Sequence, residues 1–170
     1  MDKLIKTILY EWKDKELPSL LLRKVKLSKF LQVNPRKVIA VTGFRRTGKT
    51  YLCWQFIKEI LKRFNKEEVV YINFEDERIP LKIEFLTELL PSIKATFDKK
   101  LKVLILDEVH NIPLWSKWLR RVYDNEDTQI FVTGSSSKMS SHEIPTELRG
   151  DVWKFLSPPY HLMNFYNLKT

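Results

Sequence analysis

The segment TGFRRTGKTYL, residues 42–52, sets the organisation of the whole chain. It holds two of the four glycines in a chain of 170 residues, and Lys49 and Thr50 follow directly after the second of these glycines. The β-branched run KVIAV at 37–41 precedes the segment, and the residues at 51–64 that follow are apolar at helical spacing. The segment therefore predicts a tight connection between a buried strand and a helix.

Residues 43–50, GFRRTGKT, match the phosphate-binding pattern G-x-x-x-x-G-K-[ST], with an ordinary glycine-containing turn as the alternative. Glycines at both ends of the pattern allow backbone torsions that a Cβ would block, so successive N–H groups can surround an anion. The N-terminus of the following helix faces the same anion. We expect Lys49 to reach the β- and γ-phosphates and Thr50 to bind Mg²⁺. The residues predicted to contact the nucleotide are Gly43, Phe44, Arg45, Arg46, Thr47, Gly48, Lys49 and Thr50.

Two adjacent carboxylates, Asp107 and Glu108, follow the apolar run VLIL at 103–106. Carboxylates at the end of a buried strand are costly without a cation partner. We expect Asp107 to hold Mg²⁺, largely through water, and Glu108 to orient or deprotonate the attacking water. Many strands end in an acidic turn, so the pair alone is weak evidence for a metal site. It becomes strong evidence because the phosphate-binding pattern lies upstream of it.

Strand-like and helix-like segments alternate along the chain, which predicts right-handed crossovers and an α/β fold. The sheet is expected to be mostly parallel, with helices on both faces. The expected strands are a short one at 25–27 and longer ones at 37–41, 69–74, 102–108, 129–137 (running into a loop) and 151–156. The expected helices are 3–15, 49–63, 82–90 (ending near Pro91) and 114–124, and Trp54, Trp115 and Trp118 are expected in the core.

The composition limits the surroundings and partners of the chain. A total of 30 Lys and Arg against 21 Asp and Glu gives a net charge of +9. This charge favours phosphate-bearing partners such as DNA or RNA, whereas solvated lysine-rich helix faces would give the same composition. The single cysteine, Cys53, cannot form an internal disulfide, so we expect a core role for it and a cytoplasmic location. The apolar runs are too short for a membrane span, and the N-terminus does not match a secretory signal.

Four segments together resemble the archaeal-type predicted ATPases of the AAA superfamily, a STAND-like group of P-loop NTPases. These segments are GFRRTGKT (43–50), YINFEDERI (71–79), LDEVHNIPLWSKWLRRVYD (106–124) and FVTGSSSKM…ELRG (131–150). The resemblance implies a three-layer fold with a five-stranded sheet of order 5-1-4-3-2, ATP and Mg²⁺ as cofactors, and Glu108 as the catalytic carboxylate. It also implies that a polar residue at the end of the fourth strand senses the γ-phosphate. Thr133 and Ser135 both fit this role, and Ser135 is favoured.

Two further residues have an expected role and a plain alternative. The resemblance implies that Arg149 is an arginine finger, which reaches the γ-phosphate bound by a neighbouring copy in a homo-oligomer. The alternative for Arg149 is a surface salt bridge to Glu147 or Asp151. Asn73, at the end of the second strand, is expected either to hold Glu108 away from water or to cap the strand end.

The expected division of the chain is an N-terminal helix and lead-in segment at 1–36, an AAA-type ATPase core at 37–157, and the start of a C-terminal extension at 158–170. Members of the family continue into a helical lid and a further domain. ATP hydrolysis is therefore expected to be slow for this chain alone and to be completed by a partner subunit or another domain. The alternative function is a nucleotide-dependent switch, or a nucleic-acid-associated binding module, with little turnover.

Overall fold

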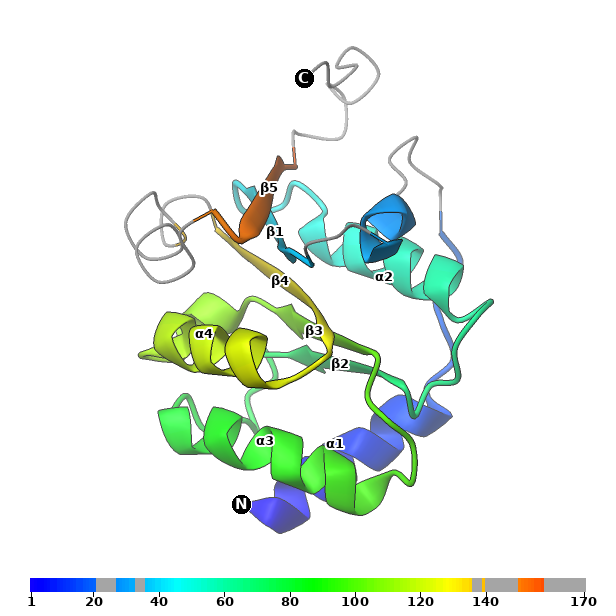
Figure 1. Cartoon of the computed structure of the whole chain (residues 1–170), viewed down its shortest axis with the longest axis vertical. Coiled ribbons are helices and arrows are strands. Elements are labelled where there is room, and N and C mark those ends of the chain that lie inside the picture. The colour runs from blue at the N-terminus through cyan, green and yellow to red at the C-terminus, as the bar shows by residue number, and fades with distance from the viewer. Residues whose placement is uncertain (21–26, 33–35, 136–138, 140–149, 158–170) are drawn as a thin grey trace.

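The computed structural model describes residues 1–20, 27–32, 36–135, 139 and 150–157, and these residues build a parallel sheet (Figure 1). The order of its five strands is β2-β3-β4-β1-β5, and every neighbouring pair is parallel. This order confirms the prediction of 5-1-4-3-2. The strands are β1 (Val38–Gly43), β2 (Val69–Asn73), β3 (Val103–Asp107), β4 (Gln129–Ser135) and β5 (Val152–Leu156).

Helices cover both faces of the sheet, as the alternating sequence pattern predicted (Figure 1). Because side chains alternate along a strand, one face of β1 presents Val38 and Ala40 and the other presents Ile39 and Val41. The first face packs against α1 (Asp2–Asp14), α3 (Ile83–Thr96) and α4 (Trp115–Asn125). The second packs against α2 (Lys49–Ile60), and Trp12 of α1 joins that cluster. Two 3₁₀ helices, η1 (Leu27–Gln32) and η2 (Val109–Asn111), complete the described elements.

The helix α3 corrects a sequence prediction, because it does not end near Pro91 but continues to Thr96. A proline inside a helix costs about 3 kcal/mol through a lost hydrogen bond and a steric clash. Pro91 lies on the exposed side of α3, while Ser92 and Ile93 beyond it are buried. The Ser92 hydroxyl also donates to Asp2 Oδ1 at 2.8 Å, which ties α3 to α1. Burial of the helix face therefore outweighs the local effect of the proline.

Other local predictions have mixed outcomes. The short strand expected at 25–27 is wrong at Leu27, which begins η1, and its first two residues lie outside the described ranges. The core assignment of Trp54, Trp115 and Trp118 is confirmed, since all three are buried. None of the helices in the described part of the chain is long and apolar enough to cross a membrane.

The parallel topology brings the polar segments of the sequence to one edge of the sheet. The carboxyl end of β1 leads into the phosphate-binding pattern, and β3 ends at Asp107. Strand register places Asn73 of β2 beside Asp107, and Gly43 of β1 beside Ser135 of β4. Parallel α/β folds bind their ligands at this edge, so the fold supports the expected position of the site.

Candidate functional site

The loop between β1 and α2 has the backbone form expected of an anion cradle. Arg46 and Gly48 adopt left-handed torsions, with φ values of 65° and 78°. The Thr47 hydroxyl donates to the carbonyl oxygen of Phe44 at 2.9 Å and so closes the loop on itself. Because the N–H groups in the first turn of a helix have no partner within that helix, the start of α2 at Lys49 presents donors to a bound anion.

Gly43, the first glycine of the pattern, was expected to supply unusual backbone torsions, and this expectation is wrong. Gly43 is absent from the positive-φ positions in the described ranges, so torsional freedom is not its role. A Cβ on Gly43 would instead lie 2.7 Å from Thr47 Oγ1 and 2.8 Å from the Ser157 carbonyl oxygen. Ser157 also donates its backbone N–H to the Thr42 carbonyl oxygen at 2.6 Å and its hydroxyl to the Thr47 carbonyl oxygen at 3.2 Å. Gly43 is therefore needed because the segment after β5 packs directly on the loop.

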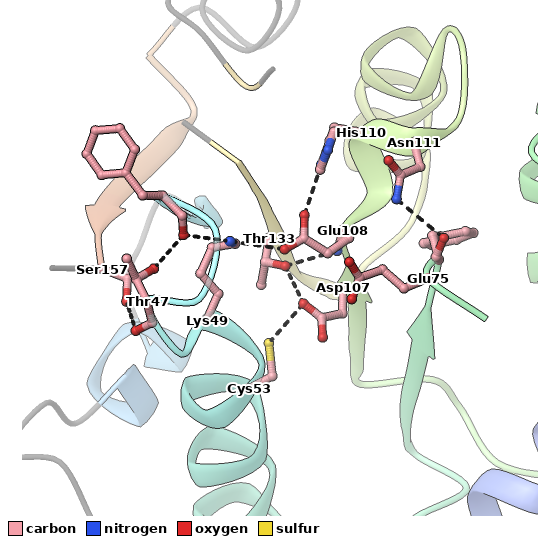
Figure 2. Close-up of polar contacts among 12 residues, drawn as sticks. Thr47, Lys49, Cys53, Glu75, Asp107, Glu108, His110, Asn111, Thr133 and Ser157 are labelled. Carbon is pink, nitrogen blue, oxygen red and sulfur yellow. Dashed lines mark hydrogen bonds and ion pairs between the residues drawn. The ribbon is translucent and has the colours of Figure 1, made fainter. Parts of the chain in front are cut away.

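Lys49 points across the sheet edge toward the acidic pair at the end of β3 (Figure 2). Its ammonium nitrogen lies 3.0 Å from Glu108 Oε1 and donates to the Phe44 carbonyl oxygen at 3.3 Å. The side chains of Lys49 and Glu108 are only 5% and 12% exposed, so the ion pair is largely shielded from water. The structure thus brings together the predicted phosphate-contacting lysine and the predicted catalytic carboxylate.

Asp107 is fully buried and is held by donors from three neighbouring elements. Thr133 of β4 donates its hydroxyl to Oδ1, and Tyr71 of β2 donates its hydroxyl to Oδ2 at 2.9 Å. Cys53 of α2 directs its thiol at Oδ1 from 4.0 Å. Burial, followed by the charge of Asp107, raises the pKa of Tyr71 far above its ordinary value, so Tyr71 remains a proton donor. These contacts fix the direction in which Asp107 presents its carboxylate.

Glu108 occupies a backbone conformation that is uncommon for residues other than glycine, with φ of 55°. Its backbone N–H donates to Thr133 Oγ1 at 3.0 Å, so one hydroxyl serves both acidic residues. The carboxylate lies between Lys49 and His110, whose Nδ1 is 3.2 Å from Oε2 (Figure 2). The turn after β3 therefore aims Glu108 at the phosphate-binding loop.

Thr50 and Asp107 carry the type of oxygen ligand that the predicted metal prefers. Mg²⁺ prefers oxygen ligands and is commonly bound by one or two protein groups together with waters and nucleotide phosphates. Within the described residues, no group of three or more His, Cys, Asp or Glu side chains is placed to hold a metal ion by itself. A hydroxyl and a carboxylate beside a phosphate-binding loop match Mg²⁺ binding in which waters and nucleotide phosphates supply the other ligands.

The remaining predicted residues are placed as follows. Asn73 Oδ1 accepts the backbone N–H of Glu75 at 3.0 Å, which is the strand-capping role that the sequence analysis gave as the alternative. Ser135 is half-buried at the end of β4. Phe44, Arg45 and Arg46 are exposed on the loop. Arg149 lies outside the described residues.

Two residues of this site, Tyr71 and His110, were not predicted from the sequence. Tyr71 lies within the apolar run of β2, where its hydroxyl is the only polar side-chain atom between Val69 and Ile72. That hydroxyl was the available signal, because a buried tyrosine needs a hydrogen-bond partner. His110 follows Glu108 by two residues, and its spacing gave no comparable signal.

A cleft of about 340 Å³ opens beside Thr50, between α1, α2 and the end of β2. Three aromatic side chains line it, Trp12, Trp54 and Tyr71. Arg78 lies at its rim, where the guanidinium pairs with Glu11 at 2.7 Å and ties α1 to the segment after β2. Since Tyr71 also donates to Asp107, the wall of this cleft is continuous with the predicted metal site.

Comparison with known proteins shows the family of this chain. The sequence model described as AAA domain matches residues 35–166, and the chain belongs to this family. An uncharacterized protein of Methanocaldococcus jannaschii, MJ1544, is 40% identical over 144 residues, which cover 82% of this chain and 30% of that protein. An uncharacterized protein of Haemophilus influenzae is 25% identical over 133 residues, covering 76% of this chain and 33% of that protein. The chain thus spans about a third of the length of these relatives.

The fold has a counterpart among solved structures. The Orc1 protein of Aeropyrum pernix, in complex with DNA, has a TM-score of 0.54 and 14% sequence identity to this chain. The similarity covers 91% of this chain and 49% of that protein. Together with the strand order, this similarity supports an AAA-type P-loop fold.

Proposed function

We propose that this chain binds ATP with Mg²⁺ and hydrolyses the bond between the β- and γ-phosphates. The observation that carries the proposal is the convergence of Lys49, Asp107 and Glu108 beside a loop with the torsions of an anion cradle. A phosphate-binding loop alone is common to many nucleotidases. A shielded carboxylate within reach of the loop lysine adds the group that hydrolysis needs.

Each residue has a distinct task in this reaction. The backbone N–H groups of 44–49 surround the phosphates, and Lys49 exchanges its contact with Glu108 for one with the γ-phosphate. Thr50 and Asp107 would hold Mg²⁺, and the ion would supply positive charge beside the phosphates. Glu108 accepts a proton from a water molecule whose oxygen bonds to the γ-phosphorus. The bond from that phosphorus to the bridging oxygen breaks, and ADP carries away the electron pair.

The proposed partner dependence rests on sequence length and on Arg149. The matched residues cover only 30% and 33% of the two relatives, so those proteins have room for further domains that could complete or regulate such a site. We propose that Arg149 supplies an arginine finger to a neighbouring copy, as the resemblance to the STAND-like group implies. Slow turnover by the chain alone follows from this arrangement.

The decisive experiment combines calorimetry with phosphate release. Wild-type protein is expected to bind ATP·Mg²⁺ and release phosphate, whereas Lys49→Ala is expected to lose binding. Lys58→Ala is the matched control, because Lys58 carries the same charge on the exposed side of the same helix. Equal affinity of Lys49→Ala and wild type would refute the proposed nucleotide site.

A second candidate function is a nucleotide-dependent module that acts on nucleic acid. The net charge of +9 favours it, and the similar Orc1 structure is a complex with DNA. Turnover measured with and without DNA or RNA separates the two functions. A tight nucleotide complex with little turnover in either condition would favour the switch.

A further inference from the structure

We propose that His110 is a positioning residue, which holds the Glu108 carboxylate in place when Lys49 moves to the phosphates. This inference rests on the proposed ATP hydrolysis at the same site. Within the ranges that the structure describes, Lys49 and His110 are the two side chains at ion-pair distance from Glu108. Lys49 lies next to Oε1 and His110 lies next to Oε2, so each carboxylate oxygen has one nitrogen neighbour.

Glu108 needs a second partner because Lys49 pairs with Glu108 in the absence of nucleotide and with a phosphate in its presence. When the Lys49 ammonium contacts a phosphate, Oε1 loses that partner and becomes the oxygen available to a water molecule. Oε2 then has His110 as its neighbour, and a hydrogen bond from Nδ1 to Oε2 would stop the carboxylate from rotating freely. A carboxylate with one fixed oxygen presents the other in a defined direction, which is what a general base requires.

The fold holds in place the turn that carries His110. Its side chain is only 5% exposed, and the backbone N–H of Asn111 donates to the Glu108 carbonyl oxygen at 3.1 Å, which closes η2 into a tight turn. The Asn111 side chain also donates to the Phe74 carbonyl oxygen at 3.4 Å and ties this turn to the end of β2. His110 is therefore carried on a short, doubly anchored turn rather than on a free loop.

Strand β4 provides the space for this histidine. A Cβ on Gly134 would lie 2.6 Å from His110 Nδ1 and 2.1 Å from Met139 Sδ, both far inside normal contact distances. Thr133, the preceding residue, binds the Glu108 backbone and Asp107. The pair Thr133–Gly134 thus explains part of the TGSSS segment: one residue fixes the acidic pair, and the next leaves room for the imidazole.

His110 and Glu108 are close enough for a hydrogen bond but are not aligned for one. His110 Nδ1 and Glu108 Oε2 are 3.2 Å apart, but their approach does not meet hydrogen-bond geometry. Catalytic hydrogen bonds are often poorly aligned before substrate binds and tighten afterwards. The release of Oε1 by Lys49 allows the carboxylate to turn toward His110 and complete the bond.

The alternative is that His110 only fills space beside β4. Three substitutions separate the two roles. Asparagine places its amide nitrogen near the position of Nδ1, whereas glutamine places it near Nε2, and leucine fills a similar volume with no donor. Positioning through Nδ1 predicts an order of activity in which asparagine is best, and packing predicts no such order.

The kinetic test measures kcat and KM for ATP in each variant. His110→Leu is expected to lower kcat about 10- to 100-fold, as loss of an orienting partner does, with little change in KM. His110→Asn is expected to recover most of the loss and His110→Gln little of it. In a Glu108→Gln background, His110→Leu is expected to have no further effect, because His110 acts through Glu108. Wild-type kcat in His110→Leu, or equal loss in all three variants, would overturn the proposal.

A spectroscopic measurement tests the contact without any turnover. Nitrogen-15 NMR of the imidazole is expected to show a proton on Nδ1 of His110, with a signal that shifts in Glu108→Gln but not in the control Glu75→Gln. The chain has three histidines, so the signal is assigned by its loss in His110→Asn. An unprotonated Nδ1, or a signal indifferent to Glu108→Gln, would overturn the positioning role even if ATP is hydrolysed. Absence of hydrolysis in wild type, with this signal present, would instead count against the proposed function.

Discussion

Replacing Glu108 with glutamine is expected to separate ATP binding from hydrolysis and to strengthen binding. The amide has nearly the same shape as the carboxylate but cannot accept a proton from water. Loss of a general base typically lowers the rate by about 10²- to 10⁴-fold. Binding is expected to improve because Lys49, which now pairs with Glu108 at 3.0 Å, would no longer be held by a competing negative charge.

The size of the binding effect follows from the geometry of the ion pair. At 3.0 Å, the attraction between two unit charges is about 1.4 kcal/mol at the dielectric constant of water and about 5.5 kcal/mol at an effective constant of 20. The desolvation of the two shielded side chains offsets much of the larger figure. The lower figure is therefore the better guide, and about 1.4 kcal/mol corresponds to a roughly tenfold lower Kd.

The assay is calorimetric titration with ATP·Mg²⁺, paired with phosphate release under the same conditions. Glu75→Gln serves as the control, because it removes the same charge from an exposed carboxylate at the end of β2. An unchanged Kd in Glu108→Gln would refute the competition between Glu108 and the phosphates for Lys49. Wild-type turnover would refute Glu108 as the base and would point to Asp107, or to Asp76, which lines the cleft beside Thr50.

Three other predictions address different parts of the molecule. Tyr71→Phe removes the donor to buried Asp107 and is expected to cost about 1–3 kcal/mol of stability, whereas Tyr10→Phe, at an exposed site, should leave the thermal midpoint unchanged. Hydrogen bonds from Arg78 lower the pKa values of Glu11 and Asp76. Their contribution to stability is therefore complete above the pKa values of the unfolded chain and is lost as the pH falls through the lowered pKa values of the folded chain. The stability difference between wild type and Arg78→Gln should therefore be present at neutral pH and shrink below about pH 4, and a difference that grows in acid would contradict the pairing. Finally, turnover per chain should rise with protein concentration, and Arg149→Ala should flatten that rise while ATP affinity stays the same; a concentration-independent wild-type rate would argue against a finger acting in trans.

The sequence was sufficient for features that depend on local pattern. The phosphate-binding pattern requires a strand before it and a helix after it, and both are present around residues 43–50. The alternation of strands and helices was enough to predict a parallel sheet, and the family resemblance supplied its strand order. In contrast, the end of α3 was missed because local propensity favours termination at Pro91, whereas burial of Ile93 depends on tertiary packing.

The contacts that complete the site depend on residues far apart in the sequence. The Tyr71 hydroxyl meets Asp107 only because β2 and β3 are neighbours, with Asn73 beside Asp107 in the strand register. The role of Gly43 likewise depends on Ser157, which follows the last strand. The spacing of residues along the chain does not indicate which of them come into contact. These two contacts could therefore not be predicted before the strand order and register were known.

Strand β4 links the separate parts of the proposed hydrolytic site. Its position between β1 and β3 places it beside both the phosphate-binding loop and the acidic pair. The Thr133 hydroxyl already bonds Asp107 and the Glu108 backbone, so its first task is to hold these two residues. We therefore propose Ser135 for the phosphate-sensing role, since it lies farther along the same strand and beside Gly43 in the register. Two residues of β4 thus adjoin Glu108: Thr133 accepts its backbone N–H, and Gly134 leaves room for His110 beside its carboxylate.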